Sequence, residues 1–154
     1  AVRISGLEVK GTVRVGSATG VKLALGHTQG RDTATGKPLN SVNPRKLMVG
    51  VDHTVGAWQL GAALTHVAAK DASDIHNTLT GTNTQFATPA YTTLDVKASW
   101  QVSKSTRLTA AVHNLTNRKY WEWTNVRGIA SNSPTLDSYT APGRSLSVGL
   151  VTAF

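Results

Sequence analysis

The last stretch of the sequence, Ser145-Leu-Ser-Val-Gly-Leu-Val-Thr-Ala-Phe154, decides the fold. Its apolar residues alternate with small or polar ones: Leu146, Val148, Leu150 and Phe154 against Ser145, Ser147, Gly149 and Ala153. A period of two residues is the signature of a β-strand. A strand with one apolar and one hydrophilic face, ending on an aromatic residue, is typical of the wall of an outer-membrane β-barrel.

Further segments upstream alternate in the same way: Leu7–Val15, Val21–Thr28, Leu47–Asp52, Trp58–Thr65, Leu94–Ser103 and Arg107–His113. Several approach the roughly 9 to 11 residues that a tilted strand needs to cross a bilayer, and exceed the usual strand of about 5 or 6 residues. The pattern alone does not say which face points inward, because a soluble sandwich would bury its apolar face. It predicts an all-β protein of about seven antiparallel strands.

The lengths of the connections favour the membrane. Short turns at 16–20, 55–57 and 103–106 alternate strictly with long polar stretches at 31–40, 71–90 and 117–141. This alternation gathers the turns at one end of the sheet and the loops at the other, as in outer-membrane barrels with periplasmic turns and extracellular loops. A soluble sandwich has no reason to keep such an asymmetry.

Composition excludes several classes. The 154 residues contain no cysteine, which removes disulfides and thiolate metal sites. The net charge of +8 comes from Lys and Arg that are scattered rather than clustered, so we expect no nucleic-acid partner. No apolar run approaches the roughly 20 residues of a membrane helix, and the N-terminus lacks the features of a signal peptide.

Aromatic residues fall near the predicted strand ends, in two groups. Trp58, Trp100 and Phe154 lie beside the short turns, and a second group lies near the long loops: Tyr91, Tyr120, Trp121, Trp123 and Tyr139. Two aromatic belts at the two membrane interfaces account for this placement. The alternative is aromatic residues scattered through a soluble core.

An open sheet of about seven strands would leave unpaired edges in lipid, at a cost of several kcal/mol for each bare backbone group. Bacterial barrels generally have even strand numbers. We therefore expect this chain to be part of a larger barrel whose other strands lie upstream.

The C-terminal motifs point to a family. The stretches Asn114–Trp121 and Tyr139–Arg144, followed by the final strand, resemble the C-terminus of TonB-dependent outer-membrane receptors, and Lys119–Gly128 most resembles their haem and haemoglobin branch. The resemblance implies that residues 1–154 are the C-terminal part of a roughly 22-stranded barrel, with the plug domain absent. The family's haem-ligating histidine and its flanking motifs have no match here.

The resemblance implies a non-enzymatic receptor in the Gram-negative outer membrane that imports haem, or haem from host haemoproteins. Its partners would be outer-membrane lipid and the TonB complex, the latter through the missing N-terminal part. Haem would be the transported ligand and not a resident cofactor. A ferric-siderophore receptor of the same architecture is the first alternative, and an outer-membrane barrel enzyme or adhesin is the second.

Candidate ligand-binding residues lie in the predicted outer loops. His76 is a candidate haem ligand, because imidazole is the usual axial ligand, or else a solvated loop histidine. Tyr120, Trp121 and Trp123 form a cluster for a flat apolar ligand or a protein partner, or else an interface belt. Arg127 is a candidate for binding an anionic group, or else pairs with a carboxylate in the lumen. We expect no metal site and no catalytic residues.

The polar face predicts interactions inside the barrel. Glu8 with Lys10, and Asp95 with Lys97, are expected to form ion pairs on the lumen side, where His113 is expected to form a hydrogen bond. Three further histidines fall on the lipid-side parity near strand ends: His27, His53 and His66.

Overall fold

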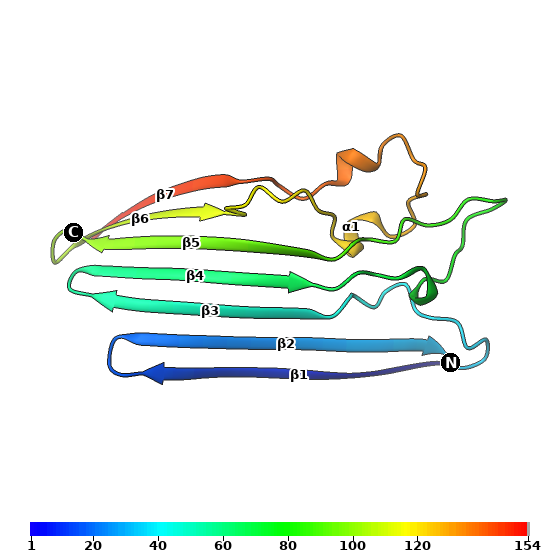
Figure 1. Cartoon of the computed structure of the whole chain (residues 1–154), viewed down its shortest axis with the longest axis horizontal. Helices are drawn as coiled ribbons and strands as arrows, with labels where there is room; N and C mark the ends of the chain where they lie inside the picture. Colours follow the sequence, from blue (N-terminus) through cyan, green and yellow to red (C-terminus); the bar gives the residue numbers. More distant parts are fainter. Residues whose placement is uncertain (154) are drawn as a thin grey trace.

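The computed structural model describes residues 1–153 and consists of one antiparallel sheet with the loops at one end (Figure 1). The seven strands lie in the order of the sequence, β1 to β7. Their bounds are β1 Val2–Val15, β2 Thr19–Asp32, β3 Lys46–Val55, β4 Trp58–Val67, β5 Tyr91–Gln101, β6 Thr106–His113 and β7 Ser145–Thr152. The predicted all-β meander is confirmed, and Phe154 lies outside the described residues.

Turns and loops are segregated as the sequence predicts. The tight turns after β1, β3 and β5 lie at one end of the sheet, and the three long connections lie at the other (Figure 1). Gly16 and Gly56 occupy two of the tight turns with positive φ, 64° and 55°, a conformation that a side chain disfavours. The short helical turns outside the sheet therefore all lie at the loop end.

The strand register sorts the side chains into two faces. Paired residues such as Leu25 with Leu47, and Leu64 with Leu94, are both apolar. On the opposite face Lys22 is paired with Gly50, and Gly61 with Lys97. Because cross-strand partners point to the same side, the sheet has one continuous face of aliphatic residues, the apolar face, and one of charged and small residues, the polar face.

Nothing in the described residues packs over the apolar face. Leu146 and Val148 on β7 are 70% and 67% exposed. The buried apolar side chains instead lie at the loop end, where Val67, Trp123 and Val126 are each below 10% exposure. The loops thus have a small core of their own, whereas the sheet has none. No helix among residues 1–153 has the length and apolar character needed to cross a membrane.

The first hairpin is longer than its alternation predicts. β1 and β2 stay paired up to Val2 with Asp32, whereas β2 and β3 separate after Gly26 with Lys46. Polar residues and glycines interrupt the apolar alternation in this part of both strands, so the sequence pattern ended too early. Backbone pairing needs no apolar side chains, and it continues.

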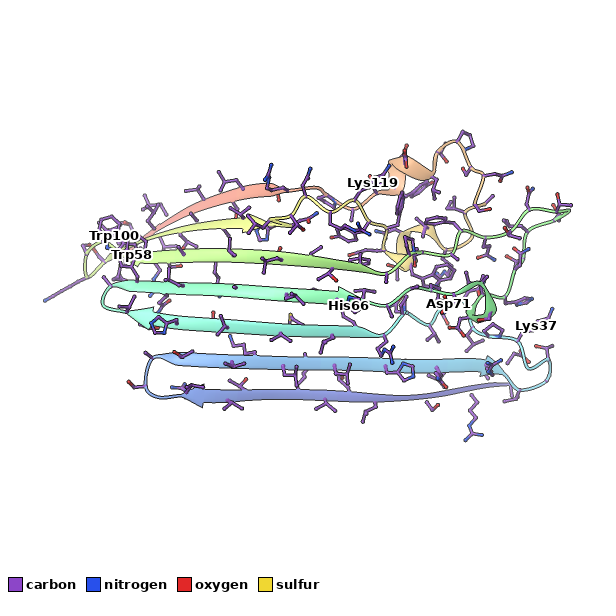
Figure 2. All side chains as sticks on the ribbon, viewed as in Figure 1. Lys37, Trp58, His66, Asp71, Trp100 and Lys119 are labelled. Carbon is purple, nitrogen blue, oxygen red and sulfur yellow. The ribbon has the colours of Figure 1, made fainter. Side chains whose placement is uncertain are left out.

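The predicted aromatic belt at the turn end is confirmed for Trp58 and Trp100. Trp58 and Trp100 are cross-strand partners on the apolar face and stack with ring centroids 5.5 Å apart at the turn end (Figure 2). The second predicted belt is wrong for Trp123, Tyr91 and Tyr120. Trp123 is only 3% exposed among the loops, and Tyr91 has the parity of the polar face and stacks on Tyr120 at 4.1 Å. These rings pack within the loops because the loops offer them partners there.

Candidate functional site

Three long connections form the loop end: loop A (residues 33–45), loop B (68–90) and loop C (114–144). Together we call them the loop cluster. Loop B contains the 3-10 turn η1 Ala72–Asp74, and loop C contains the short helix α1 Trp123–Val126 and the 3-10 turn η2 Leu136–Tyr139. The three loops come from different strand pairs, so any contact between them crosses the rim of the sheet (Figure 1).

Loops A and B are joined by a reciprocal pair of hydrogen bonds. The Asn40 side-chain amide donates to the His76 carbonyl at 2.7 Å, and the His76 backbone N–H donates to Asn40 Oδ1 at 2.8 Å. A second link runs from Lys70 Nζ to the Val42 carbonyl at 3.0 Å. An amide side chain that satisfies both backbone groups of one residue fixes that residue's position as well as its orientation.

Loops B and C are joined through Gln85, a residue that is only 5% exposed. Its Nε2 donates to the His76 carbonyl at 3.0 Å, and its Oε1 accepts the Gly128 N–H at 3.1 Å. Next to it the two loops form a short antiparallel bridge, in which Phe86 N–H donates to the Ile129 carbonyl at 2.8 Å. A buried amide with both ends satisfied stabilises the contact, and would destabilise it if either partner moved away.

Loops A and C meet at Trp123. Its indole N–H donates to the Asn40 carbonyl at 2.7 Å, and the Lys70 ammonium lies 5.3 Å from the ring centroid. Burial lowers the pKa of Lys70 from its usual value, against the opposing effect of Asp74. A desolvated cation over an indole gains more from the ring than an exposed one does, so Lys70 and Trp123 stabilise the junction of all three loops.

The base of loop C explains the asparagines in its sequence. Asn114 and Asn117 have positive φ values of 47° and 52°, which asparagine tolerates better than most residues. The buried Asn114 side chain donates to the Arg118 and Pro142 carbonyls, at 2.9 and 3.2 Å. Its backbone N–H donates to Asp95 Oδ1 at 2.7 Å. These contacts pull both ends of loop C together above β6 and β7.

The candidate residues from the sequence divide into two groups. Trp123 and the His76 backbone belong to the buried frame just described. The His76 imidazole is half-buried, with Nε2 3.1 Å from Lys37 Nζ, so that the ammonium donates to it. Arg127 is exposed and belongs to none of the ion pairs found in residues 1–153.

The other two aromatic candidates, Trp121 and Tyr120, pack against different neighbours. Trp121 packs edge-on against Phe86 with centroids 5.3 Å apart, and its indole N–H donates to the Leu136 carbonyl at 3.0 Å. Tyr120 stacks on Tyr91, and burial, together with the nearby Glu122, raises the pKa of the Tyr120 phenol. The three aromatic candidates therefore do not share one surface, contrary to what their adjacency in sequence suggests.

The frame residues Asn40, Lys70 and Gln85 were missed by sequence reasoning. Each is polar and lies in a loop with no periodic pattern, so nothing marked it as buried. The arrangement as a whole suits binding through exposed side chains held on a rigid support. No group of three or more potential metal ligands occurs in the part of the chain that the structure describes.

The polar face contains a linked set of charges. Asp52 accepts from Lys22 at 2.6 Å and from Lys97 at 3.2 Å, which ties β2, β3 and β5 together across β4. Gly61 lies between them, and a Cβ there would come within 2.5 Å of Lys97 Cε. The predicted Asp95–Lys97 pair is wrong, because the space above Gly61 lets Lys97 reach Asp52.

Two other predictions for the polar face are confirmed. Lys10 Nζ lies 2.6 Å from Glu8 Oε1. The His113 ring is within hydrogen-bond distance of the Ser147 hydroxyl, at 3.3 Å, and both have the parity of the polar face.

Relatives that are similar in sequence align with most of the chain. The haemoglobin and haemoglobin–haptoglobin-binding protein A of Haemophilus influenzae is 29% identical over an alignment of 140 positions, gaps included, that covers 82% of this chain and 13% of that protein. The haemoglobin–haptoglobin utilization protein B of Neisseria meningitidis serogroup C is 27% identical over an alignment of 170 positions, gaps included, that covers 92% of this chain and 20% of that protein. The chain thus spans a fifth or less of the length of these relatives.

Solved structures superpose on nearly the whole chain. The copper transporter OprC has a TM-score of 0.85 at 20% identity, covering 99% of this chain and 24% of its own. The ferric enterobactin receptor PfeA of Pseudomonas aeruginosa has a TM-score of 0.75 at 23% identity, covering 98% and 22%. At this identity the likeness shows the fold, which is that of an outer-membrane barrel wall.

The family pattern described as "TonB dependent receptor-like, beta-barrel" matches residues 1–115, most of the strands and two of the three outer loops. The apolar face is then the surface that meets lipid, and the polar face lines the lumen. The chain belongs to the TonB-dependent receptor β-barrel family and forms part of the wall of a barrel in the Gram-negative outer membrane.

Proposed function

We propose that this chain supplies the wall and outer loops with which a TonB-energised receptor binds haemoglobin or a related haem protein and takes up its haem. One observation carries the proposal. The relatives named for binding haemoglobin, or haemoglobin with haptoglobin, align with 82% and 92% of the chain, a span too long to exclude the outer loops. A solved copper transporter and a solved ferric enterobactin receptor share the fold at lower identity.

The construction of the loop cluster supports a protein ligand. Binding a protein costs less free energy when the receptor surface is already ordered, because fewer side chains and loops are immobilised on contact. Asn40, Gln85 and Trp123 link the three loops before any ligand arrives. Exposed side chains on this frame are therefore presented at fixed positions, which suits recognition of a folded surface.

The candidate residues take separate roles in this proposal. Arg127 is exposed beside Gly128, whose N–H is held by Gln85, so its guanidinium is carried on a fixed backbone and can pair with a carboxylate of the ligand. Lys37 and His76 form a second polar pair on loops A and B. Trp123 positions the loops and does not contact the ligand, because it is buried.

Transport in this proposal involves no covalent chemistry on the ligand. The outer loops bind the haem protein, haem is released, and energy relayed by TonB moves it through the barrel. The plug and the TonB contact are proposed for the remainder of the receptor. Outer-membrane lipid surrounds the apolar face, and haem is the transported ligand and not a resident cofactor.

The test uses the full-length receptor in detergent and measures binding to immobilised haemoglobin. We expect R127Q to weaken binding about tenfold, since loss of one charge-assisted hydrogen bond costs roughly 1.5 kcal/mol or more. The matched control is K104Q, which removes a positive charge from the turn at the opposite end of the sheet. Equal affinities for R127Q, K104Q and the parent receptor would remove Arg127 from the binding surface.

A second readout separates the proposal from its alternative. Cells starved of iron and dependent on this receptor are expected to grow on haemoglobin. Growth on ferric enterobactin but not on haemoglobin, with no haemoglobin binding in vitro, would replace the proposal with a siderophore receptor. Haem added to the purified receptor reports a direct haem site through its Soret band, and H76A tests whether His76 contributes to that band.

A further inference from the structure

The apolar face ends at a sharp boundary on the loop side. Along β1 to β5, the aliphatic residue of the apolar face that lies nearest the loops has a polar residue two positions closer to the loops. These polar residues are Ser5, His27, Arg45, His66 and Thr92. Two residues of a strand span about 7 Å, and the headgroup layer on each side of a bilayer is roughly 5 to 7 Å thick. These polar residues therefore stand at the level of the outer-leaflet headgroups.

Three arginines gather on this face at the first hairpin. Arg3 and Arg31 are direct cross-strand partners, and both have the parity of the apolar face. Arg45 directly precedes β3, and it lines the same cavity as His27 and Arg31. Like charges placed opposite each other destabilise a sheet unless an opposite charge lies between them. Arg3, Arg31, Arg45 and His27 are named the cationic patch.

No residue of the patch belongs to an ion pair within residues 1–153, although Asp71 and Asp74 line the same cavity as Arg31 and Arg45. The four ion pairs within residues 1–153 use Lys10, Lys22, Lys97 and Lys119, and none uses an arginine. Arg31 donates only to the neutral Gly36 carbonyl, at 3.0 Å. The three guanidinium groups therefore form no direct ion pair in the part of the chain that the structure describes.

A cavity opens at the patch. It has a volume of about 360 Å³ and lies where β3 has left the sheet, between the upper part of β2 and residues 68–71. His27, Arg31 and Arg45 line it together with Gln29. Two carboxylates, Asp71 and Asp74, line it from loop B, and Asp74 is the one whose charge acts on Lys70.

The histidine in this cavity has an unused donor. His27 Nε2 lies 3.2 Å from Gln29 Nε2, an amide nitrogen that can only donate, so Nε2 accepts and Nδ1 carries the proton. Nδ1 is buried and has no hydrogen-bond partner in the described protein. A buried N–H without an acceptor is costly, and an oxygen atom entering the cavity would satisfy it.

We propose that the cationic patch binds a phosphorylated lipid headgroup of the outer leaflet. The phosphate oxygens accept from the guanidinium groups and from His27, while the acyl chains lie along the apolar face directly below. A soluble anion would satisfy the charges equally well, but only a lipid unites them with the aliphatic surface at Leu25 and Leu47. The patch is independent of the ligand that the outer loops bind.

The test measures lipid bound to the full-length receptor in detergent by native mass spectrometry. The probes are diphosphorylated lipid A and the same lipid after removal of its phosphates. We expect the parent receptor to retain the phosphorylated form, and the triple variant R3Q/R31Q/R45Q to lose about fivefold in affinity for each arginine, since one basic residue near an anionic surface contributes roughly 1 kcal/mol.

The matched control removes three cations elsewhere: R14Q and R107Q on the polar face, and K104Q in a turn. It is expected to bind lipid like the parent. The single variant R45Q repeats the test with two arginines in place, so an unstable triple variant leaves the result decidable. Equal retention by the patch and control variants, equal retention of the dephosphorylated lipid, or displacement by millimolar inorganic phosphate would overturn the proposal.

Discussion

Replacing Trp123 with alanine is expected to destabilise the contacts between the three loops while leaving the pairing of the strands intact. Trp123 is 3% exposed and contacts loops A and B through its indole N–H on Asn40 and its ring beneath Lys70. No strand relies on it for pairing, because the sheet is held by backbone hydrogen bonds between neighbouring strands. The free energy of loop opening should therefore change and that of strand opening should not.

The magnitude depends on how much packing and hydrogen bonding each substitution removes. Truncating a buried aromatic side chain to alanine costs about 3 to 5 kcal/mol. W123F keeps most of the packing and leaves the Asn40 carbonyl without its donor, at about 1 to 3 kcal/mol. Because 1.4 kcal/mol corresponds to about a factor of ten, we expect loop protection to fall at least a hundredfold in W123A and by roughly tenfold in W123F.

Hydrogen exchange on the full-length receptor measures this directly. The amides to follow are those that link loops, such as His76 N–H, Phe86 N–H and Gly128 N–H. Amides of the β5–β6 ladder serve as the internal control. Unchanged exchange at the linking amides, or an equal acceleration in the ladder, would refute the view that Trp123 holds the loops as a unit separate from the wall.

Two further substitutions test the two faces of the sheet. G61A is expected to displace Lys97 and to lower the denaturant midpoint of the receptor by an amount equivalent to about 1 kcal/mol or less, because an exposed ion pair contributes little. The control is G26A, where an added Cβ meets nothing. Equal midpoints for G61A and G26A would contradict the ion pair that Lys97 forms with Asp52 over Gly61. V148R on the apolar face is expected to cost about 2 to 4 kcal/mol, whereas G149R on the polar face should be tolerated, and a reversed order would contradict the assignment of faces.

The strands were predictable because the alternation within each segment is visible in its own residues. Alternation in 145–154 reports the environment of each face residue by residue, and β7 at Ser145–Thr152 agrees with it. The alternating lengths of the connections then indicated the orientation. The predicted strand began too late, at Leu7, because the aliphatic residues before it, Val2 and Ile4, fall on the opposite face from Leu7 and Val9. Alternation of side chains predicts a strand only as far as the same face stays apolar, whereas backbone pairing can continue beyond that point.

The loop cluster was not predictable for a different reason. The hydrogen bonds of Asn40 with His76 and of Gln85 with Gly128 join residues that are 36 and 43 positions apart. No periodic pattern in the sequence indicates them. Trp123 was assigned to a membrane belt because its position near a strand end fits both a belt and a loop core. Only the three-dimensional contacts distinguish a ring that faces headgroups from one enclosed by other loops.

The function of the wall depends on its apolar face meeting hydrocarbon and its polar face lining the lumen. Ala110 and Ala111 on β6 offer a matched pair, being the same residue on opposite faces of one strand. Each is replaced by cysteine in turn, in a full-length receptor freed of other cysteines, and labelled with a nitroxide in lipid vesicles. We expect the label at position 110 to collide with oxygen more than with a water-soluble nickel complex, and the label at 111 not to. The opposite preference, or no difference between the two positions, would contradict this assignment of the faces.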